Sequence, residues 1–112
     1  MHPRLLPVIV CALAAAGAPA AELPAKAGAF IDKHCAGCHD SVEKKGDLDL
    51  TALALNPADP KNFSLWLKVH DRAESGEMPP KKKARPPADE LRDFLGAIGK
   101  SLTQAELARA GA

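Results

Sequence analysis

Five consecutive residues, Cys35-Ala36-Gly37-Cys38-His39, constrain this chain more than any other feature. Two thiols three positions apart, followed at once by an imidazole, are typical of a covalent haem attachment site. Each cysteine can form a thioether with one vinyl group of the porphyrin, and His39 then lies where the proximal iron ligand is needed. Gly37 has no Cβ atom, so the backbone can pass close to the ring edge. The motif therefore predicts one covalently bound haem c.

Three other uses of a Cys-x-x-Cys pair stay open at this point: half of a zinc site, a redox dithiol, or a short disulfide. A structural zinc site needs four ligands, and only His34, His39 and His70 are available to complete one. The chain has no second Cys-x-x-Cys and no His-x-x-x-His pair. A redox dithiol expects a strand followed by a helix, and no strong strand pattern is visible. Haem is the favoured reading of the motif.

The first 20 residues have the pattern of a secretory signal peptide. Arg4 is followed by an apolar run, Leu5–Ala16, and then by a small-residue segment of the Ala-x-Ala kind. The apolar run is too short to cross a bilayer, so we expect no membrane span after cleavage. Cleavage is predicted after Ala20 or, as the second choice, after Ala21, which removes Cys11. Export to the periplasm or beyond agrees with covalent haem attachment, which takes place outside the cytoplasm; an uncleaved anchor is the alternative.

Charge and length limit what the rest of the chain can do. Removing residues 1–20 takes away one basic residue, Arg4, and leaves equal numbers of basic and acidic side chains. This balance gives no case for nucleic-acid binding. The 92 remaining residues allow one domain, predicted as residues 21–100 with a C-terminal extension at 101–112. So short a chain buries a limited core, and a mostly apolar porphyrin would reinforce it.

Apolar spacing predicts an all-α fold of three to four helices around the haem. The predicted helices are 24–34, 59–76 and 87–99, with a short last turn at 103–109. We expect Gly76 and Gly99 to end the second and third of these. The first and last helices should pack across each other. The apolar faces should be formed by Ala27, Phe30 and Ile31; by Leu65, Trp66, Val69 and Ala73; and by Leu91, Phe94, Leu95 and Ile98.

Met78 is the candidate for the second axial position on the iron. It is the one methionine left after signal cleavage, and it lies in the stiff sequence Met78-Pro79-Pro80. A thioether ligand favours reduced iron and raises the reduction potential. A proline-rich loop is a poor place for a core methionine, which is the simpler alternative. His70 is the competing ligand and would give a lower potential.

Together these motifs resemble a class I c-type cytochrome and, more specifically, the planctomycete-type cytochrome c domain. The resemblance covers about residues 27–99. It is carried by Phe30 to His39, Lys45-Gly46-Asp47-Leu48-Asp49-Leu50, Trp66 to Val69, Ser75-Gly76-Glu77-Met78-Pro79-Pro80 and the helix around Leu91 to Ile98. It implies covalent haem on Cys35 and Cys38, with His39 and Met78 as axial ligands. In that family the domain often begins a longer secreted protein, so the chain is either free-standing or a separated front piece.

Several residues are expected to support the haem. The Nδ1–H of His39 needs an acceptor, predicted as a backbone carbonyl between Ser41 and Leu48. Leu48 and Leu50 are expected to lie in a loop rather than a short extended piece. Trp66 either contacts a haem propionate through its indole N–H or is a plain core residue.

A basic run follows Met78 and consists of Lys81, Lys82, Lys83 and Arg85. It either steers an acidic redox partner protein to the haem side of the molecule or forms a solvated loop. We expect the protein to be a monomer.

The function predicted from these residues is single-electron transfer without catalysis. No acid–base pair, nucleophile or phosphate-binding loop is apparent, so no catalytic residue is assigned. The alternative is an enzyme or sensor module in which Met78 leaves the iron open, within a larger secreted oxidoreductase. A zinc-binding module that uses Cys35 and Cys38 is a third, weaker class.

Overall fold

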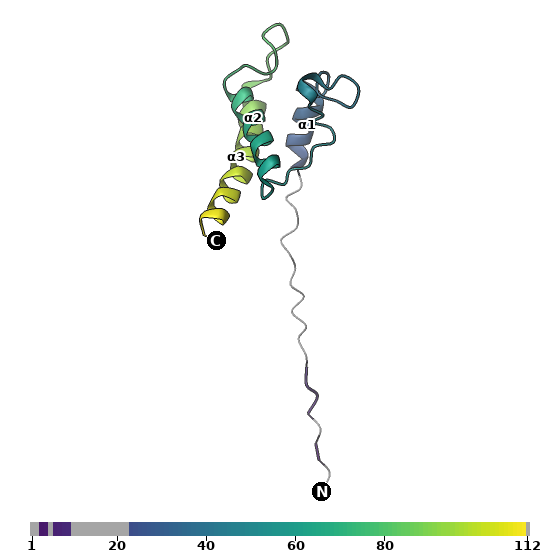
Figure 1. Cartoon of the computed structure of the whole chain (residues 1–112), viewed down its shortest axis with the longest axis vertical. Helices are drawn as coiled ribbons and strands as arrows, with labels where there is room; N and C mark the ends of the chain where they lie inside the picture. The colour runs from purple at the N-terminus through teal and green to yellow at the C-terminus, as the bar shows by residue number, and fades with distance from the viewer. Residues whose placement is uncertain (1–2, 5, 10–22, 112) are drawn as a thin grey trace.

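The computed structural model describes residues 3–4, 6–9 and 23–111. They contain three α-helices, α1 (Ala25–His34), α2 (Pro60–Glu74) and α3 (Ala88–Ala110), and one short 3-10 helix, η1 (Lys45–Asp47). None of these residues forms a β-strand. The predicted all-α fold is therefore confirmed. Figure 1 shows α2 and α3 side by side, with α1 and the segment that follows it next to them.

Helix α1 begins one residue after Pro24, whose carbonyl accepts the N–H of Gly28 at 3.0 Å. Its buried residues are Ala27, Phe30 and Ile31, the three predicted from their spacing. Phe30 stacks on Phe94 of α3 with ring centroids 4.4 Å apart and ring planes 13° apart. The first and last helices therefore pack against each other as predicted.

Helix α2 begins with the predicted cap at Asp59, whose side chain accepts the N–H of Asn62 at 3.3 Å. After Ser75, the chain turns at Gly76, where φ is 78°, a value that favours glycine. One predicted core position is wrong: Leu65 is 39% exposed. It precedes the fully buried Trp66 by one residue and so lies about 100° around the helix from it.

Helix α3 continues past Gly99 to Ala110, so the predicted end at Gly99 is wrong. A glycine inside a helix costs about 1 kcal/mol relative to alanine. Burial of Leu102 one turn later offsets that cost, since burying a leucine contributes about 2 kcal/mol. A Cβ atom at Gly99 would lie 3.6 Å from Nε2 of His70, which shows how closely α2 approaches here.

The last turns of α3 are part of the packed structure, and no break occurs at residue 100. The predicted separate turn from Thr103 is wrong, because Thr103 lies inside the helix and does not cap one. Arg109 donates from Nη2 to the carbonyl of Pro57 at 2.9 Å and lies over the ring of Phe63 at 4.6 Å from its centroid. The segment after residue 100 therefore holds the start of α2.

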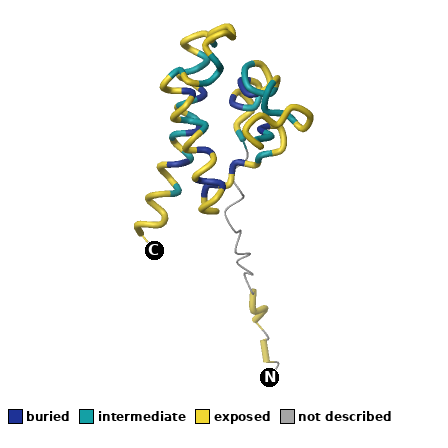
Figure 2. The backbone as a smooth tube through the Cα atoms, turned by 45° about the horizontal axis from the view of Figure 1, so that its top comes forward, coloured by how far each residue is buried: buried dark blue, intermediate teal, exposed yellow. Residues whose placement is uncertain are grey.

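The core lies where α3 contacts α1 and α2, and Figure 2 shows the buried positions along these helices. Leu48 and Leu50 lie in a loop after η1, as predicted: Leu50 is buried and Leu48 is partly buried against the core. The buried apolar side chains are Ala27, Phe30, Ile31, Leu50, Leu55, Phe63, Trp66, Ala73, Phe94, Ile98 and Leu102.

Most of the predicted signal peptide, residues 1–20, lies outside the described residues, as do Cys11 and both cleavage positions. Residues 3–4 and 6–9 are described and form no helix or strand. No helix in the described part of the chain has the length and apolar character needed to cross a bilayer.

Candidate functional site

The Cys-Ala-Gly-Cys-His motif forms a tight turn directly after α1. The N–H of Cys35 donates to the carbonyl of Ile31 at 2.9 Å, so the motif starts as a continuation of the helix. The carbonyl of Cys35 then accepts the N–H groups of Cys38 at 3.3 Å and His39 at 3.1 Å. These bonds bring the two thiol-bearing residues and the imidazole-bearing residue onto one turn of backbone.

The segment after the motif is tied back to it by main-chain bonds. The carbonyl of Cys38 accepts the N–H of Lys45 at 2.9 Å, and the carbonyl of His39 accepts the N–H of Leu50 at 2.8 Å. Gly46 has φ of 66°, which explains the glycine in the turn that makes this return possible. Main-chain N–H and carbonyl groups thus connect the turn both to α1 before it and to the loop after it.

The side chain of His39 departs from the prediction made for it. Its Nδ1 atom is buried and has no hydrogen-bond partner, so the predicted carbonyl acceptor between Ser41 and Leu48 is wrong in this structure. The loop carbonyls are used elsewhere: that of Lys44 accepts from Asp47, and that of Lys45 from Leu48. A buried nitrogen without a partner is costly, so the imidazole of His39 lacks the acceptor that would fix its orientation.

The two thiols are free, and their surroundings separate the alternatives to haem. Burial raises the pKa of the Cys35 thiol to about 11. A redox dithiol needs a thiolate that forms readily, so this position disfavours that use. In the described ranges no group of three or more His, Cys, Asp or Glu side chains is placed to hold a metal ion. A four-ligand zinc site therefore finds no support in the geometry.

Met78 lies in the loop between α2 and α3, and the structure gives it a half-buried position. Its N–H donates to the carbonyl of Arg72 in the last turn of α2 at 3.0 Å. The peptide bond between Met78 and Pro79 is cis. Since Gly76 reverses the chain direction, the loop folds back onto the end of α2 before it reaches α3.

Both candidate ligand segments lie at the same end of the helices. The last turn of α1 contacts the first turn of α3 through Glu90, whose carboxylate is 3.3 Å from Nζ of Lys33 and 3.1 Å from Nε2 of His34. The hydrogen bond with His34, followed by that with Lys33, lowers the pKa of Glu90. Cys35 follows the last residue of α1, and the Met78 loop leads into the first turn of α3. Both segments therefore lie at the end of the helices where α1 ends and α3 begins (Figure 1).

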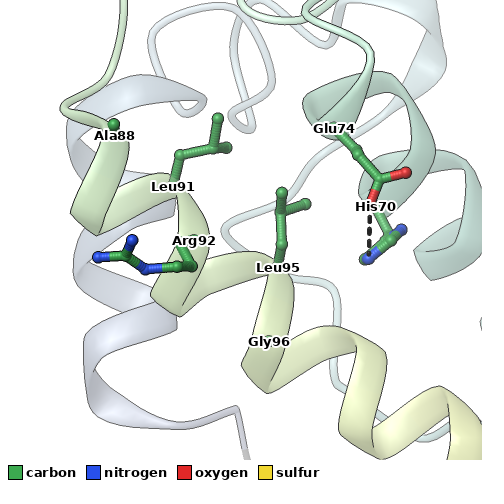
Figure 3. A pocket seen from close by; sticks show the side chains of 7 residues that line it. All are labelled: His70, Glu74, Ala88, Leu91, Arg92, Leu95 and Gly96. Atoms are coloured by element: carbon green, nitrogen blue, oxygen red, sulfur yellow. Dashed lines mark ion pairs between the residues drawn. The ribbon is translucent and has the colours of Figure 1, made fainter.

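His70, the competing axial ligand, has carboxylates beside both ring nitrogens. Nδ1 is 3.0 Å from Oδ1 of Asp71, and Nε2 is 3.9 Å from Oε2 of Glu74. Figure 3 shows His70 and Glu74 on α2 facing a pocket whose other wall includes Leu91 and Leu95 of α3. Neither Met78 nor any residue of the Cys-Ala-Gly-Cys-His motif lines this pocket. The pocket beside His70 is therefore separate from both candidate ligand segments, and the choice between Met78 and His70 stays a prediction.

Trp66 is placed as a core residue. It is fully buried, and its Nε1–H donates to the carbonyl of Ala54 at 2.9 Å. The same carbonyl accepts Nδ2 of Asn62 at 2.6 Å. Because the single indole donor is engaged inside the protein, the structure favours the core alternative over the propionate contact predicted for Trp66.

The basic run after Met78 divides into two parts. All four residues are exposed, but the guanidinium of Arg85 points back to the loop and donates to the carbonyl of Gly76 at 3.3 Å and that of Pro80 at 2.7 Å. The three lysines form no side-chain hydrogen bond or ion pair with any described residue. Arg85 is therefore less available for docking than the sequence suggested, whereas Lys81, Lys82 and Lys83 stay accessible.

These residues fit a haem c. The donor set consists of two free thiols and an imidazole on one turn, and a thioether sulfur on a loop at the same end of the helices. A Cβ atom at Gly37 would meet no atom within 4 Å, and Gly37 has no positive φ, so no protein contact explains the glycine. A glycine there would let the backbone approach a porphyrin edge closely. When bound, the group supplies a single-electron couple at its iron.

Sequence reasoning missed two contacts at this end of the molecule. Arg85 was assigned to docking. The sequence did contain a signal for its structural contact, because the prolines beside Met78 have no N–H and leave nearby carbonyls short of donors. Glu90 was not singled out at all. Its partners lie more than 50 positions away in the sequence, and nothing local indicates such a contact.

Comparison with known families agrees with this geometry. The family described as Planctomycete cytochrome C matches residues 35–82, a range that starts at Cys35 and includes Met78. No match to this chain was found among curated proteins or among solved structures. The matched range contains both the Cys-Ala-Gly-Cys-His turn and the Met78 loop described above. Residues 35–82, less than half of the chain, are therefore similar to the Planctomycete cytochrome C family.

Proposed function

We propose that this chain is an exported c-type cytochrome that carries single electrons on one covalently attached haem. Thioethers from Cys35 and Cys38 would hold the group, and His39 and Met78 would bind the iron from opposite sides. The observation that carries the proposal is the turn in which the Cys35 carbonyl accepts the N–H groups of both Cys38 and His39. Such a turn would bring two thiols and an imidazole to one ligand.

The two axial residues have different tasks in this proposal. His39 follows Cys38 directly, so attachment of the thiols also places its imidazole. Met78 provides a soft, neutral sulfur, which stabilises the reduced state and raises the potential. With both positions filled by protein atoms, no site is left for a substrate. Electron transfer without bond chemistry is then the function that this ligand set serves.

Export would follow from the signal peptide proposed for residues 1–20, with cleavage after Ala20 or Ala21. Residues 21–100 would form the cytochrome domain, and its C-terminal extension at 101–112 would continue helix α3 without a break. Outside the cytoplasm the protein would meet its redox partner as a monomer. The exposed lysines, Lys81, Lys82 and Lys83, support docking of a partner with an acidic surface, because complementary charge mainly accelerates association.

Two measurements on protein matured with its haem test the proposal. Intact mass gives the number of attached haems and the cleavage position together, and haem staining of the denatured protein confirms the covalent bond. The weak far-red absorption band of the ferric protein reports an iron–methionine bond. We expect one haem, loss of residues 1–20 or 1–21, and the far-red band.

Other results would redirect the assignment. A mass equal to bare polypeptide would contradict haem attachment and return the thiols to the zinc and dithiol alternatives. A high-spin ferric spectrum without the far-red band would favour the second proposal, a haem module with an open or labile sixth position. Such a module would fit a front piece or subunit of a larger secreted oxidoreductase or sensor.

A further inference from the structure

The loop that carries Met78 is short of backbone hydrogen-bond donors. Pro79 and Pro80 have no N–H, and the N–H of Met78 is already used by the carbonyl of Arg72. The carbonyl of Pro80 accepts one main-chain N–H, that of Lys83 at 2.8 Å, and the carbonyls of Met78 and Pro79 still need donors or water. A segment of this kind cannot stabilise itself through main-chain bonds in the way that the Cys-Ala-Gly-Cys-His turn does.

Arg85 supplies donors to this segment from five to nine residues further along the chain. Its Nη1 donates to the carbonyl of Gly76 at 3.3 Å, and its Nη2 donates to the carbonyls of Pro79 and, at 2.7 Å, Pro80. A longer contact of 3.5 Å joins Nη2 to the carbonyl of Lys83. The acceptors lie on both sides of Met78, so one guanidinium bridges the loop across the methionine.

The chemistry of this bridge is specific to arginine. A guanidinium presents five N–H donors in a rigid planar fork, whereas an ammonium is a compact point charge. Hydrogen bonds from a charged donor are stronger than those between neutral groups. Three lysines lie in the same basic run, yet none of their side chains hydrogen-bonds to a described residue. Arg85 is therefore the residue of this basic run whose side chain bonds to the loop, whereas the three lysines share only its charge.

We propose that Arg85 is a positioning residue that closes the Met78 loop and thereby holds the sulfur of Met78 on the haem iron. The inference rests on the proposed function, because it takes Met78 as the axial ligand. Iron–sulfur bonds of this kind are weak, so the population in which Met78 has left the iron depends on how easily the loop opens. Loss of the bridge should increase that population without removing either ligand.

The test compares three variants of the haem-loaded protein. Arg85→Gln removes the charge and most donors of the bridge, and Arg85→Lys keeps the charge but loses the fork. Lys83→Gln removes a neighbouring charge but keeps the main-chain carbonyl that Arg85 contacts, and it is the matched control. The first readout is the affinity of the ferric protein for added imidazole, which binds only where Met78 has left the iron. The second is amide hydrogen exchange in residues 75–84, which reports loop opening directly.

We expect Arg85→Gln to bind imidazole roughly tenfold more tightly than the unaltered protein, because apparent affinity rises with the population of the open state. Its loop should also exchange faster. Arg85→Lys should restore only part of the difference, and Lys83→Gln should behave like the unaltered protein. A general loss of stability would instead speed exchange across α1 and α3 as well.

Two kinds of result would overturn the inference, and they are distinguishable from failure of the proposed function. If the unaltered protein shows the far-red band but Arg85→Gln changes neither readout, the bridge does not hold the ligand. If Lys83→Gln matches Arg85→Gln, the effect is one of charge alone. If the unaltered protein lacks the far-red band, Met78 is not a ligand and the inference fails together with that assignment.

Discussion

The turn that carries Cys35, Cys38 and His39 is held by main-chain hydrogen bonds, whereas the loop that carries Met78 combines a few such bonds with donors from the side chain of Arg85. The turn continues directly from α1, whose buried face packs on α3. The loop leaves α2 at Gly76 and returns to α3 through a proline-rich segment. The two proposed halves of the haem site are thus built with very different support.

This difference has a physical consequence for the two halves. Main-chain bonds survive most substitutions, because every residue except proline carries both groups. A bond from a side chain is lost with that residue. The attachment half should therefore tolerate sequence change. Substitutions in the Met78 half should instead alter the reduction potential and the strength of the iron–methionine bond. The contacts that join the halves include the hydrogen bond of Trp66 to Ala54 and the contacts of Glu90 with His34 and Lys33.

The largest expected effect is on the attachment half. Replacing Cys35 and Cys38 together by alanine should abolish covalent haem and leave a chain that does not unfold cooperatively, because a domain of this size has a limited core of its own. Haem staining and thermal unfolding followed by circular dichroism measure both effects. Cys35→Ala alone, which keeps one thioether, is the control and should be intermediate. A stable and cooperative helical apoprotein would contradict this expectation.

Replacing Met78 by alanine should affect only the other half. We expect haem to stay attached, the far-red band to disappear and the reduction potential to fall by on the order of a tenth of a volt, within the about 0.8 V that axial ligands span. Voltammetry measures the change. His70→Ala, which removes the competing ligand candidate, should leave the potential in place. The comparison between the halves breaks down if Met78→Ala prevents haem attachment.

Trp66→Phe tests the first contact between the halves. The substitution removes the hydrogen bond to the carbonyl of Ala54 and part of a fully buried ring. We expect a loss of about 1–3 kcal/mol in the free energy of unfolding, measured with urea, and little change in potential. Leu65→Ala on the same helix is exposed and should cost less than about 0.5 kcal/mol. A shifted potential with unchanged stability would instead indicate that the indole contacts a propionate.

Glu90→Gln tests the second contact and should have the smallest effect. The pKa of Glu90 is lowered in the folded protein, so its carboxylate adds stability above its ordinary pKa of about 4.5, and this is lost as pH falls through the folded value. The unaltered protein should therefore be slightly more stable than Glu90→Gln at neutral pH. The gap should close under acid conditions. Urea unfolding at both pH values measures it, with Asp93→Gln as a control on the same helix, and a gap that widens in acid would refute the contact.

Much of the fold could be predicted because local patterns specify it. The spacing of Ala27, Phe30 and Ile31 predicted the buried face of α1, and Asp59 before Pro60 predicted the start of α2. The end of α3 could not be predicted from local signals. Gly99 is a poor helix residue, but the decisive factor is the burial of Leu102, which depends on packing. Leu65 was assigned to the core for a related reason, since hydrophobicity alone does not say which neighbour faces inward.

The candidate site divides along the same line. Its five-residue motif and the methionine beside two prolines are visible in the sequence because covalent attachment and ligand chemistry demand those residue types; the assignments of Cys35, Cys38, His39 and Met78 stay predictions. The partners of Arg85, Glu90 and the indole of Trp66 were not visible. Which donor meets which acceptor in these contacts depends on how the folded chain brings distant residues together.

The sequence alone determined which residue types are available for the proposed haem chemistry, the helical class of the fold and the order of its segments, because these follow from residue types and spacings along the chain. Only the tertiary structure decided where α3 ends, that the indole of Trp66 faces inward and that a guanidinium bridges the Met78 loop. The physical reason is that such contacts join groups through space. Their free energy depends on burial and donor–acceptor geometry, and neither of these is a property of any short stretch of sequence.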